Sequence, residues 1–307
     1  MFAFSSDQFV LPLPANHRFP MRKYAMLRER VAAELPHVVL ADAPRASDFE
    51  LAAAHTPEYI AHIRDGTLPA ALQREIGFPW SEAMAERARR SVGATLAACR
   101  AAISGEQGTT AANLAGGTHH AYTHKGGGFC VFNDAAVASR VLQSEARAHG
   151  DMLRIAIIDL DVHQGNGTAS ILRNDADVFT LSLHGEKNFP FRKERSHLEV
   201  DLPDGTGDEA YLDALDAALR VLLQSITPQL IIYLAGADPY EHDRLGRLKL
   251  TQAGLAERDA RVFAFARNCG AALALTMAGG YCERIEETVQ IQFNTLQLAA
   301  HAGSGKG

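Results

Sequence analysis

The second half of the chain alternates short apolar runs with polar motifs and longer amphipathic stretches. The apolar runs have the length of buried strands in a parallel sheet. We expect strands over residues 110–114, 155–160, 178–183, 230–234 and 272–277. We expect helices between them over 134–149, 208–225 and 250–268. Strands that alternate with helices predict an α/β fold, with one mostly parallel sheet covered by helices on both faces.

The first half of the chain is less regular. Pro12, Pro14 and Pro20 interrupt the start of the chain, which we expect to be irregular. A helix is expected over 21–35, and another begins at Thr56-Pro57-Glu58, where proline follows a threonine cap. A long amphipathic helix is expected from Ser81 to about residue 104, and the segment 66–80 before it, with Gly and Pro breaks, is expected to be a loop.

Composition narrows the class of protein. A chain of 307 residues that is 47% hydrophobic fits one large domain, which we place at 1–300 with a flexible tail at 301–307. The net charge of −6, without blocks of like charge, argues against a nucleic-acid or membrane surface. Four widely separated cysteines and the lack of a signal peptide or membrane span predict a cytoplasmic protein with reduced thiols.

Candidate metal ligands follow the run at 155–160. Asp159, Asp161 and His163 stand at alternate positions, so in an extended chain their side chains share one face. Two carboxylates and an imidazole at a strand end are costly unless a cation lies among them. Asp161 and His163 would supply two of the three protein ligands of a catalytic zinc, and Asp238, which follows LIIYLAGA, is the candidate for the third.

Three further motifs carry candidate chemistry. His119-His120 lies in the glycine-containing motif AGGTHHA, and two imidazoles beside a metal suit proton transfer near neutral pH. Tyr281 follows AGG and either donates a hydrogen bond to a developing oxyanion or packs at the rim of the sheet. Phe129, after three glycines, and Phe189 are either pocket walls or ordinary core residues.

One motif favours a different class of protein. The segment GNGTAS at 165–170 follows a strand and opens a helix, which is close to the dinucleotide-binding pattern GxGxxG. Its sixth position is serine, and the carboxylates in the preceding DxDxH would repel a pyrophosphate. A dinucleotide-binding oxidoreductase is therefore kept as the alternative from another class.

Taken together, the motifs GGTHHA, GGGFCVFND, IDLDVHQGNG, LSLH, AGADP and AGGY resemble those of the zinc-dependent histone deacetylase family. The resemblance runs from about residue 10 to about residue 300, and GFPWSEAM and DRLG are similar to the class IV branch and its bacterial relatives. It implies the arginase/deacetylase fold, a single-domain three-layer α/β/α structure with a central, mostly parallel eight-stranded sheet. It also implies one Zn²⁺ per chain and a structural K⁺.

The resemblance assigns roles to individual residues. The zinc ligands would be Asp161, His163 and Asp238. His120 would be the proton shuttle, His119 an electrostatic helper oriented by Asp159, and Tyr281 the group that polarises the acyl carbonyl. The walls of an acyl-lysine tunnel would be Gly128, Phe129, Phe189 and Leu245. The monovalent cation would be held near Asp159, Asp161, His163, Ser182 and Leu183.

One position departs from the pattern of some family members. Asn166 stands where they place an aspartate to partner the second histidine. Asparagine accepts the imidazole N–H but carries no negative charge, so we expect a lower pKa for His120 than an aspartate would give.

The implied activity is zinc-dependent hydrolysis that removes acetyl or longer acyl groups from lysine side chains or related acylated amines. An acetylpolyamine deacetylase is one alternative, although Leu245 stands where an acidic residue would favour polyamines. A binding module that kept the fold without the activity is another. The expected partners are acylated lysine in a peptide or protein, or a small acylated amine, with no nucleic acid and no membrane; the oligomeric state is left open.

Overall fold

The computed structural model describes residues 1–14, 16–105 and 109–302, which form one eight-stranded sheet in the order β2-β1-β3-β8-β7-β4-β5-β6. Every neighbouring pair of strands is parallel. The strands are β1 (Phe2–Ser5), β2 (Val39–Asp42), β3 (Thr110–Asn113), β4 (Ile155–Asp159), β5 (Val178–Gly185), β6 (Leu198–Leu202), β7 (Leu230–Leu234) and β8 (Ala272–Thr276). The predicted eight-stranded α/β architecture is confirmed.

The five strands predicted from apolar runs are all present, whereas β1, β2 and β6 were not predicted. These three lie toward the two edges of the sheet and are only four or five residues long. Because edge strands are partly exposed, they do not need the continuous apolar run by which a central strand is recognised.

The helices match the predicted pattern except in the short segments and in α10, which was not predicted. They are α1 (Lys23–Glu34), α2 (Asp48–Leu51), α3 (Pro57–Asp65), α4 (Ala70–Ile76), α5 (Glu82–Ser104), α6 (Asp134–Ala148), α7 (Asn166–Leu172), α8 (Asp208–Ser225), α9 (Gln252–Cys269) and α10 (Ile285–Ala302). The predicted caps at Thr56 and Ser81 accept hydrogen bonds from Tyr59 N and Met84 N. The expectation of a loop at 66–80 is wrong over α4, a helix of seven residues that is too short to show a clear period.

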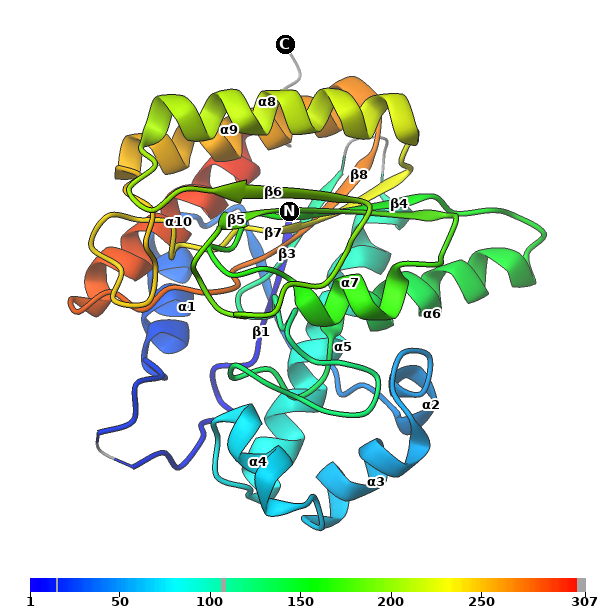
Figure 1. Ribbon diagram of the computed structural model, residues 1–307. Coiled ribbons are helices and arrows are strands. Elements are labelled where there is room, and N and C mark those ends of the chain that lie inside the picture. The colour runs from blue at the N-terminus through cyan, green and yellow to red at the C-terminus, as the bar shows by residue number, and fades with distance from the viewer. Residues whose placement is uncertain (15, 106–108, 303–307) are drawn as a thin grey trace.

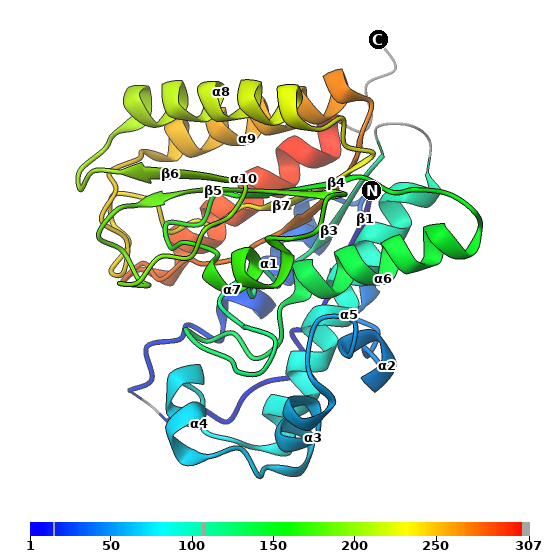
Figure 2. The same ribbon diagram turned by 45° about the vertical axis from the view of Figure 1, so that its right-hand side comes forward.

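Helices cover both faces of the sheet (Figures 1 and 2). The core on one face is made by α1, α8, α9 and α10, and the core on the other by α5, α6 and α7 with α2 to α4 packed beyond them. No helix in the described part of the chain is long and apolar enough to span a membrane. The expected tail at 301–307 begins inside α10, which continues to Ala302, and its residues 303–307 lie outside the described residues.

The sheet order brings four of the polar motifs to one edge. The strands β3, β8, β7 and β4 are consecutive neighbours, and each is followed directly by one of the motifs predicted to carry chemistry. Since all four strands are parallel, their carboxyl ends meet at the same edge of the sheet, and residues more than 100 positions apart in sequence are placed side by side.

The buried ion pair of Arg258 and Asp259 in α9 supports the chain just after β7. Arg258 is fully buried; its Nη1 donates to Gly236 O (2.6 Å) after β7, and its Nη2 lies 2.8 Å from Asp259 Oδ1. Asp259 in turn accepts hydrogen bonds from the hydroxyls of Tyr233 and Thr295, both at 2.5 Å.

Replacing Asp259 by alanine is expected to destabilise the protein by about 3–5 kcal/mol, because the Arg258 charge would remain buried without its partner. Urea unfolding measures the effect. The matched control is Glu257→Ala in the same helix, which removes an exposed ion pair with Arg261 and should leave the unfolding midpoint nearly unchanged. Equal midpoints for the two variants would contradict the structural role of the buried pair.

Candidate functional site

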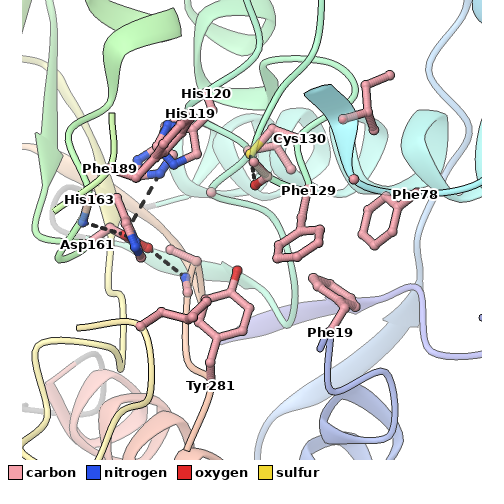
Figure 3. Close-up of a pocket in the computed structure, with 18 of the residues that line it drawn as sticks. Phe19, Phe78, His119, His120, Phe129, Cys130, Asp161, His163, Phe189 and Tyr281 are labelled. Atoms are coloured by element: carbon pink, nitrogen blue, oxygen red, sulfur yellow. Dashed lines mark hydrogen bonds and ion pairs between the residues drawn. The ribbon is translucent and has the colours of Figure 1, made fainter. Parts of the chain in front are cut away.

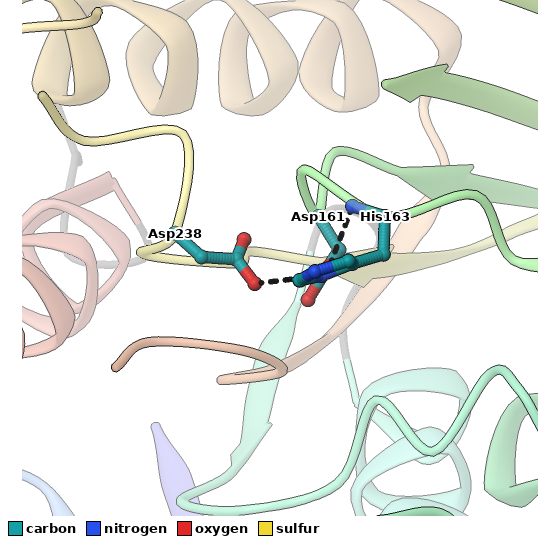
Figure 4. Close-up of side chains that lie close together, drawn as sticks. All are labelled: Asp161, His163 and Asp238. Carbon is teal, nitrogen blue, oxygen red and sulfur yellow. Dashed lines mark hydrogen bonds and ion pairs between the residues drawn. The ribbon is translucent and has the colours of Figure 1, made fainter. Parts of the chain in front are cut away.

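Three potential metal ligands converge beyond the ends of β4 and β7 (Figure 4). The ligand atoms of Asp161, His163 and Asp238 all lie within 4.8 Å of one another, and the three residues are buried. His163 Nδ1 lies 2.9 Å from Asp161 Oδ1 and 3.3 Å from Asp238 Oδ2. The structure thus brings together the three residues singled out from the sequence, although β4 ends at Asp159 and the first two ligands lie in the following bend.

Backbone N–H groups fix the direction of both carboxylates. Asp161 Oδ2 accepts from Gly279 N (2.8 Å), and Asp238 Oδ1 accepts from Val162 N (2.9 Å). Gly279 lies so close to the cluster that a Cβ on it would stand 1.9 Å from Asp238 Oδ2 and 2.6 Å from Asp161 Oδ2. The glycine pair before Tyr281 is therefore needed for the approach of β8 to the two carboxylates.

The cluster has the properties of a cation site. Asp238 Oδ2 is buried and accepts no hydrogen bond from the described residues. Burial and the negative charge of Asp161 raise the pKa of Asp238 to about 7. Burial tends to lower the pKa of His163, but the neighbouring carboxylates of Asp161 and Asp238 outweigh it and raise that pKa to about 10. Without a metal ion, Asp238 and His163 hold protons that a bound cation would displace. One nitrogen with two carboxylates is a donor set that fits a zinc ion with an open position.

The two adjacent histidines lie beside His163 and Asp161 (Figure 3). Each histidine has its own partner. His119 Nδ1 lies 2.7 Å from Asp159 Oδ2, and His120 Nδ1 lies 2.7 Å from Asn166 Oδ1. The two imidazole centroids are 4.1 Å apart, and that of His120 is 5.9 Å from that of His163. Both imidazoles reach the site because the chain turns through two left-handed glycines just before them, with φ of 79° and 70°.

Burial and neighbouring charges give the two histidines opposite protonation states. Burial lowers the pKa of His120 well below its ordinary value, and the charges of His119 and His163 act in the same direction. Burial also tends to lower the pKa of His119, but the carboxylates of Asp159 and Asp161 outweigh it and raise that pKa to about 9. At neutral pH His120 is therefore a neutral imidazole that can accept a proton, whereas His119 is a cation.

Tyr281 lies across the cavity from the histidines (Figure 3). Its N–H donates to Asp243 Oδ2 (2.6 Å), and its carbonyl accepts from Arg244 Nε (2.9 Å). Burial raises the pKa of the Tyr281 phenol well above its ordinary value, so the hydroxyl stays protonated and can donate a hydrogen bond. Asp243, which also accepts from Leu245 N (2.8 Å), was given no role at this site from the sequence.

A cavity of about 720 Å³ opens onto these groups. Its lining includes all four residues expected for a tunnel, namely Gly128, Phe129, Phe189 and Leu245. Phe129 is one of three phenylalanines that form an aromatic wall: its ring centroid lies 5.4 Å from that of Phe19 and 5.3 Å from that of Phe78, two residues that were not singled out from the sequence (Figure 3).

The residues expected near a monovalent cation lie next to the cluster of candidate metal ligands. Asp159 and Ser182 are partners in the register of β4 and β5, and Leu183 follows in β5. Asp161 N donates to Asp159 Oδ1 (3.2 Å), so this segment directly adjoins the three candidate metal ligands. Ser182 Oγ is hydrogen-bonded to His184 Nδ1 at 2.9 Å.

Comparison with known proteins agrees with this geometry. The family model for the histone deacetylase domain matches residues 17–296. Over 92% of its length this chain is 41% identical to an uncharacterized protein of Picosynechococcus sp. (92% of that protein) and 30% identical to histone deacetylase 2 of Arabidopsis thaliana (74% of that protein). A solved structure of an HDAC homolog complexed with SAHA has the same fold, with a TM-score of 0.81 and 24% identity over 97% of this chain and 83% of the other. The chain therefore belongs to the histone deacetylase family, within the arginase/deacetylase superfamily.

Proposed function

We propose that this protein is a zinc-dependent amidohydrolase that removes acetyl or longer acyl groups from lysine side chains or related acylated amines. The observation that carries the proposal is the convergence of Asp161, His163 and Asp238 with two imidazoles and a phenol on one cavity. Zinc held by these three ligands would polarise the acyl carbonyl and acidify a water molecule.

The chain's own residues divide the remaining work. The neutral imidazole of His120 takes a proton from the attacking water and later gives it to the leaving amine. The cationic His119 and the Tyr281 hydroxyl stabilise negative charge that develops on the carbonyl oxygen. The products are a free amine and a carboxylate. We assign K⁺ to the segment around Asp159, Ser182 and Leu183 as a structural ion.

The aromatic wall supports acyl groups longer than acetyl. A volume of about 720 Å³ exceeds what a lysine side chain and an acetyl group fill, and Phe19, Phe78 and Phe129 offer apolar surface to an alkyl chain. The dinucleotide alternative loses its support from GNGTAS. Gly167 is needed for packing, since a Cβ there would stand 2.2 Å from Ala121 O.

The test is hydrolysis of lysine peptides that carry acetyl, octanoyl or myristoyl groups, together with the zinc content of the purified protein. We expect near-stoichiometric zinc, loss of activity on chelation, and a higher kcat/KM for at least one longer acyl group than for acetyl. Hydrolysis that persists unchanged after complete removal of metal would overturn the zinc mechanism. Acetyl as the best substrate would overturn the preference for longer chains.

Replacing Asn166 by aspartate is expected to move the acidic limb of the pH profile of kcat/KM to higher pH, by about one pH unit. Asn166 Oδ1 lies 2.7 Å from His120 Nδ1, so a carboxylate there stabilises the protonated imidazole and raises the pKa at which the base becomes available. Tyr122→Phe is the control: its hydroxyl accepts from Asn166 Nδ2 (3.0 Å) and donates to Glu194 Oε1 (3.3 Å), and removing it changes no charge beside His120. If the acidic limb of the pH profile does not move in Asn166→Asp, His120 is not the base.

A further inference from the structure

The mouth of the cavity is positively charged, in contrast to the chain as a whole. We define the mouth as the lining residues that are exposed to solvent; its cations are Arg18, Lys187, Arg244 and Arg247. Its anion is Glu75, which lies 2.8 Å from Lys125 in an ion pair. The chain carries a net charge of −6, so this gathering of cations at one opening is a local feature.

Two of the four cations are left without a carboxylate partner in the described part of the chain. Arg247 Nη1 and Lys187 Nζ lie 3.1 Å and 4.0 Å from Asp204 Oδ2. No carboxylate of the described residues lies within 4.0 Å of Arg18 or Arg244. The pairs present therefore leave the mouth with an excess of positive charge.

Arg244 is also held in place beside the reacting groups. Its Nε donates to the carbonyl of Tyr281 (2.9 Å), and the preceding Asp243 accepts from Tyr281 N (2.6 Å). One edge of the guanidinium is thus tied to the tyrosine that faces the metal cluster. Its other N–H groups have no partner in the described residues, and a planar guanidinium is well shaped to bind a carboxylate.

We propose that the preferred substrate carries a carboxylate next to its acylated amine, and that Arg18 and Arg244 select it. The inference rests on the proposed amidohydrolase function and names its substrate class. The same charges disfavour acetylpolyamines, because a free ammonium group of the polyamine would approach cations at the mouth. The carboxylate could come from an acidic side chain beside an acyl-lysine in a protein or from the α-carboxylate of a free acylated amino acid.

Three peptides with the same acyl-lysine flanked by glutamate, glutamine or lysine test the proposal. We expect kcat/KM to fall in that order at low salt, so that the glutamate and lysine peptides differ by roughly tenfold; we call this ratio the range. In 1 M salt, where the Debye length is about 3 Å, the range should shrink toward one. Free acyl-lysine compared with its amide tests the α-carboxylate in the same way. A preference in either series supports the proposal and identifies the source; equal rates or faster hydrolysis of the lysine-flanked peptide and the amide overturn it.

The double variant Arg18→Gln/Arg244→Gln is expected to reduce the range to about threefold or less. The control Arg154→Gln/Arg220→Gln also removes two positive charges, at exposed positions before β4 and in α8. It should keep the full range. A range that survives in the first variant overturns the role of the two arginines. Peptide binding measured by fluorescence anisotropy reports the charge preference independently of turnover. Absence of hydrolysis would then count against the proposed function, whereas absence of a charge preference in binding would count against this inference.

Discussion

Replacing Asp238 by asparagine is expected to lower kcat/KM by about 10⁴-fold and to abolish stoichiometric zinc binding. The substitution keeps the hydrogen bond from Val162 N to Oδ1 (2.9 Å), so the loop after β7 retains its anchor. It removes the negative charge of Oδ2, the buried oxygen that accepts no hydrogen bond from the described residues. Loss of the metal's stabilisation of the transition state is worth several kcal/mol, and 1.36 kcal/mol corresponds to a factor of ten. Steady-state kinetics and metal analysis measure the two effects.

The same substitution is expected to stabilise the metal-free protein at pH 8, by on the order of 2 kcal/mol. The pKa of Asp238 is raised to about 7 in the folded protein, against about 3.9 in an unfolded chain. The ionised carboxylate therefore opposes folding, and the stability of the metal-free protein falls as the pH rises from 4 through 7. Asparagine removes this loss, so urea unfolding should separate the variant from the parent at pH 8 and bring them together near pH 4.

Zinc should reverse the order of stability, because it binds the folded parent and adds to its free energy of unfolding. Glu199→Gln is the control: it neutralises a half-buried carboxylate that accepts from Gln164 Nε2 (2.7 Å) and is not one of the three ligands. That variant should keep zinc and most of the activity. An Asp238→Asn protein that still binds zinc stoichiometrically would disprove the assigned ligand set.

The sequence was informative where a residue follows a buried parallel strand. Asp161, His163 and Asp238 could be predicted to meet because β4 and β7 are neighbours with the same direction, and their carboxyl ends share an edge. The reason given for the first two was only partly right. Alternation along a strand was expected to align them, but they lie in the bend after Asp159, where hydrogen bonds to the carboxylates set their directions.

The residues that the sequence did not reveal are common residue types without a distinctive spacing. Phe19 and Phe78 lie in segments distant from Phe129, and only the packing of the loops brings the three rings together. Asp243 and Arg244 hold the backbone of Tyr281 through hydrogen bonds that no periodicity encodes. Hydrophobic patterning identifies which elements form, whereas contacts between loops depend on tertiary packing. The part of the wall made by Phe19 and Phe78, and the charged mouth, therefore emerged only from the structure.

His120→Ala and Tyr281→Phe are each expected to lower kcat by about 10²–10³-fold while leaving the zinc content unchanged. His120 is the proposed base, and its lowered pKa keeps it neutral. The Tyr281 phenol, whose pKa is raised, stays protonated and is the proposed hydrogen-bond donor to the oxyanion, so neither group can take over the role of the other. Neither is among the three residues of the metal cluster. Steady-state kinetics at saturating substrate, with metal analysis of the same samples, measures the losses.

The double variant decides whether the two groups act on the same transition state. If both stabilise one step, removing the second group after the first should cost less than removing it from the parent, and the combined loss should fall short of the product of the single losses. Glu257→Ala, which removes an exposed ion pair with Arg261 in α9, should combine with either variant multiplicatively. A Tyr281→Phe protein with parental kcat would leave His119, whose pKa of about 9 keeps it cationic, as the group that stabilises the oxyanion, and the tyrosine would then belong to the wall of the cavity.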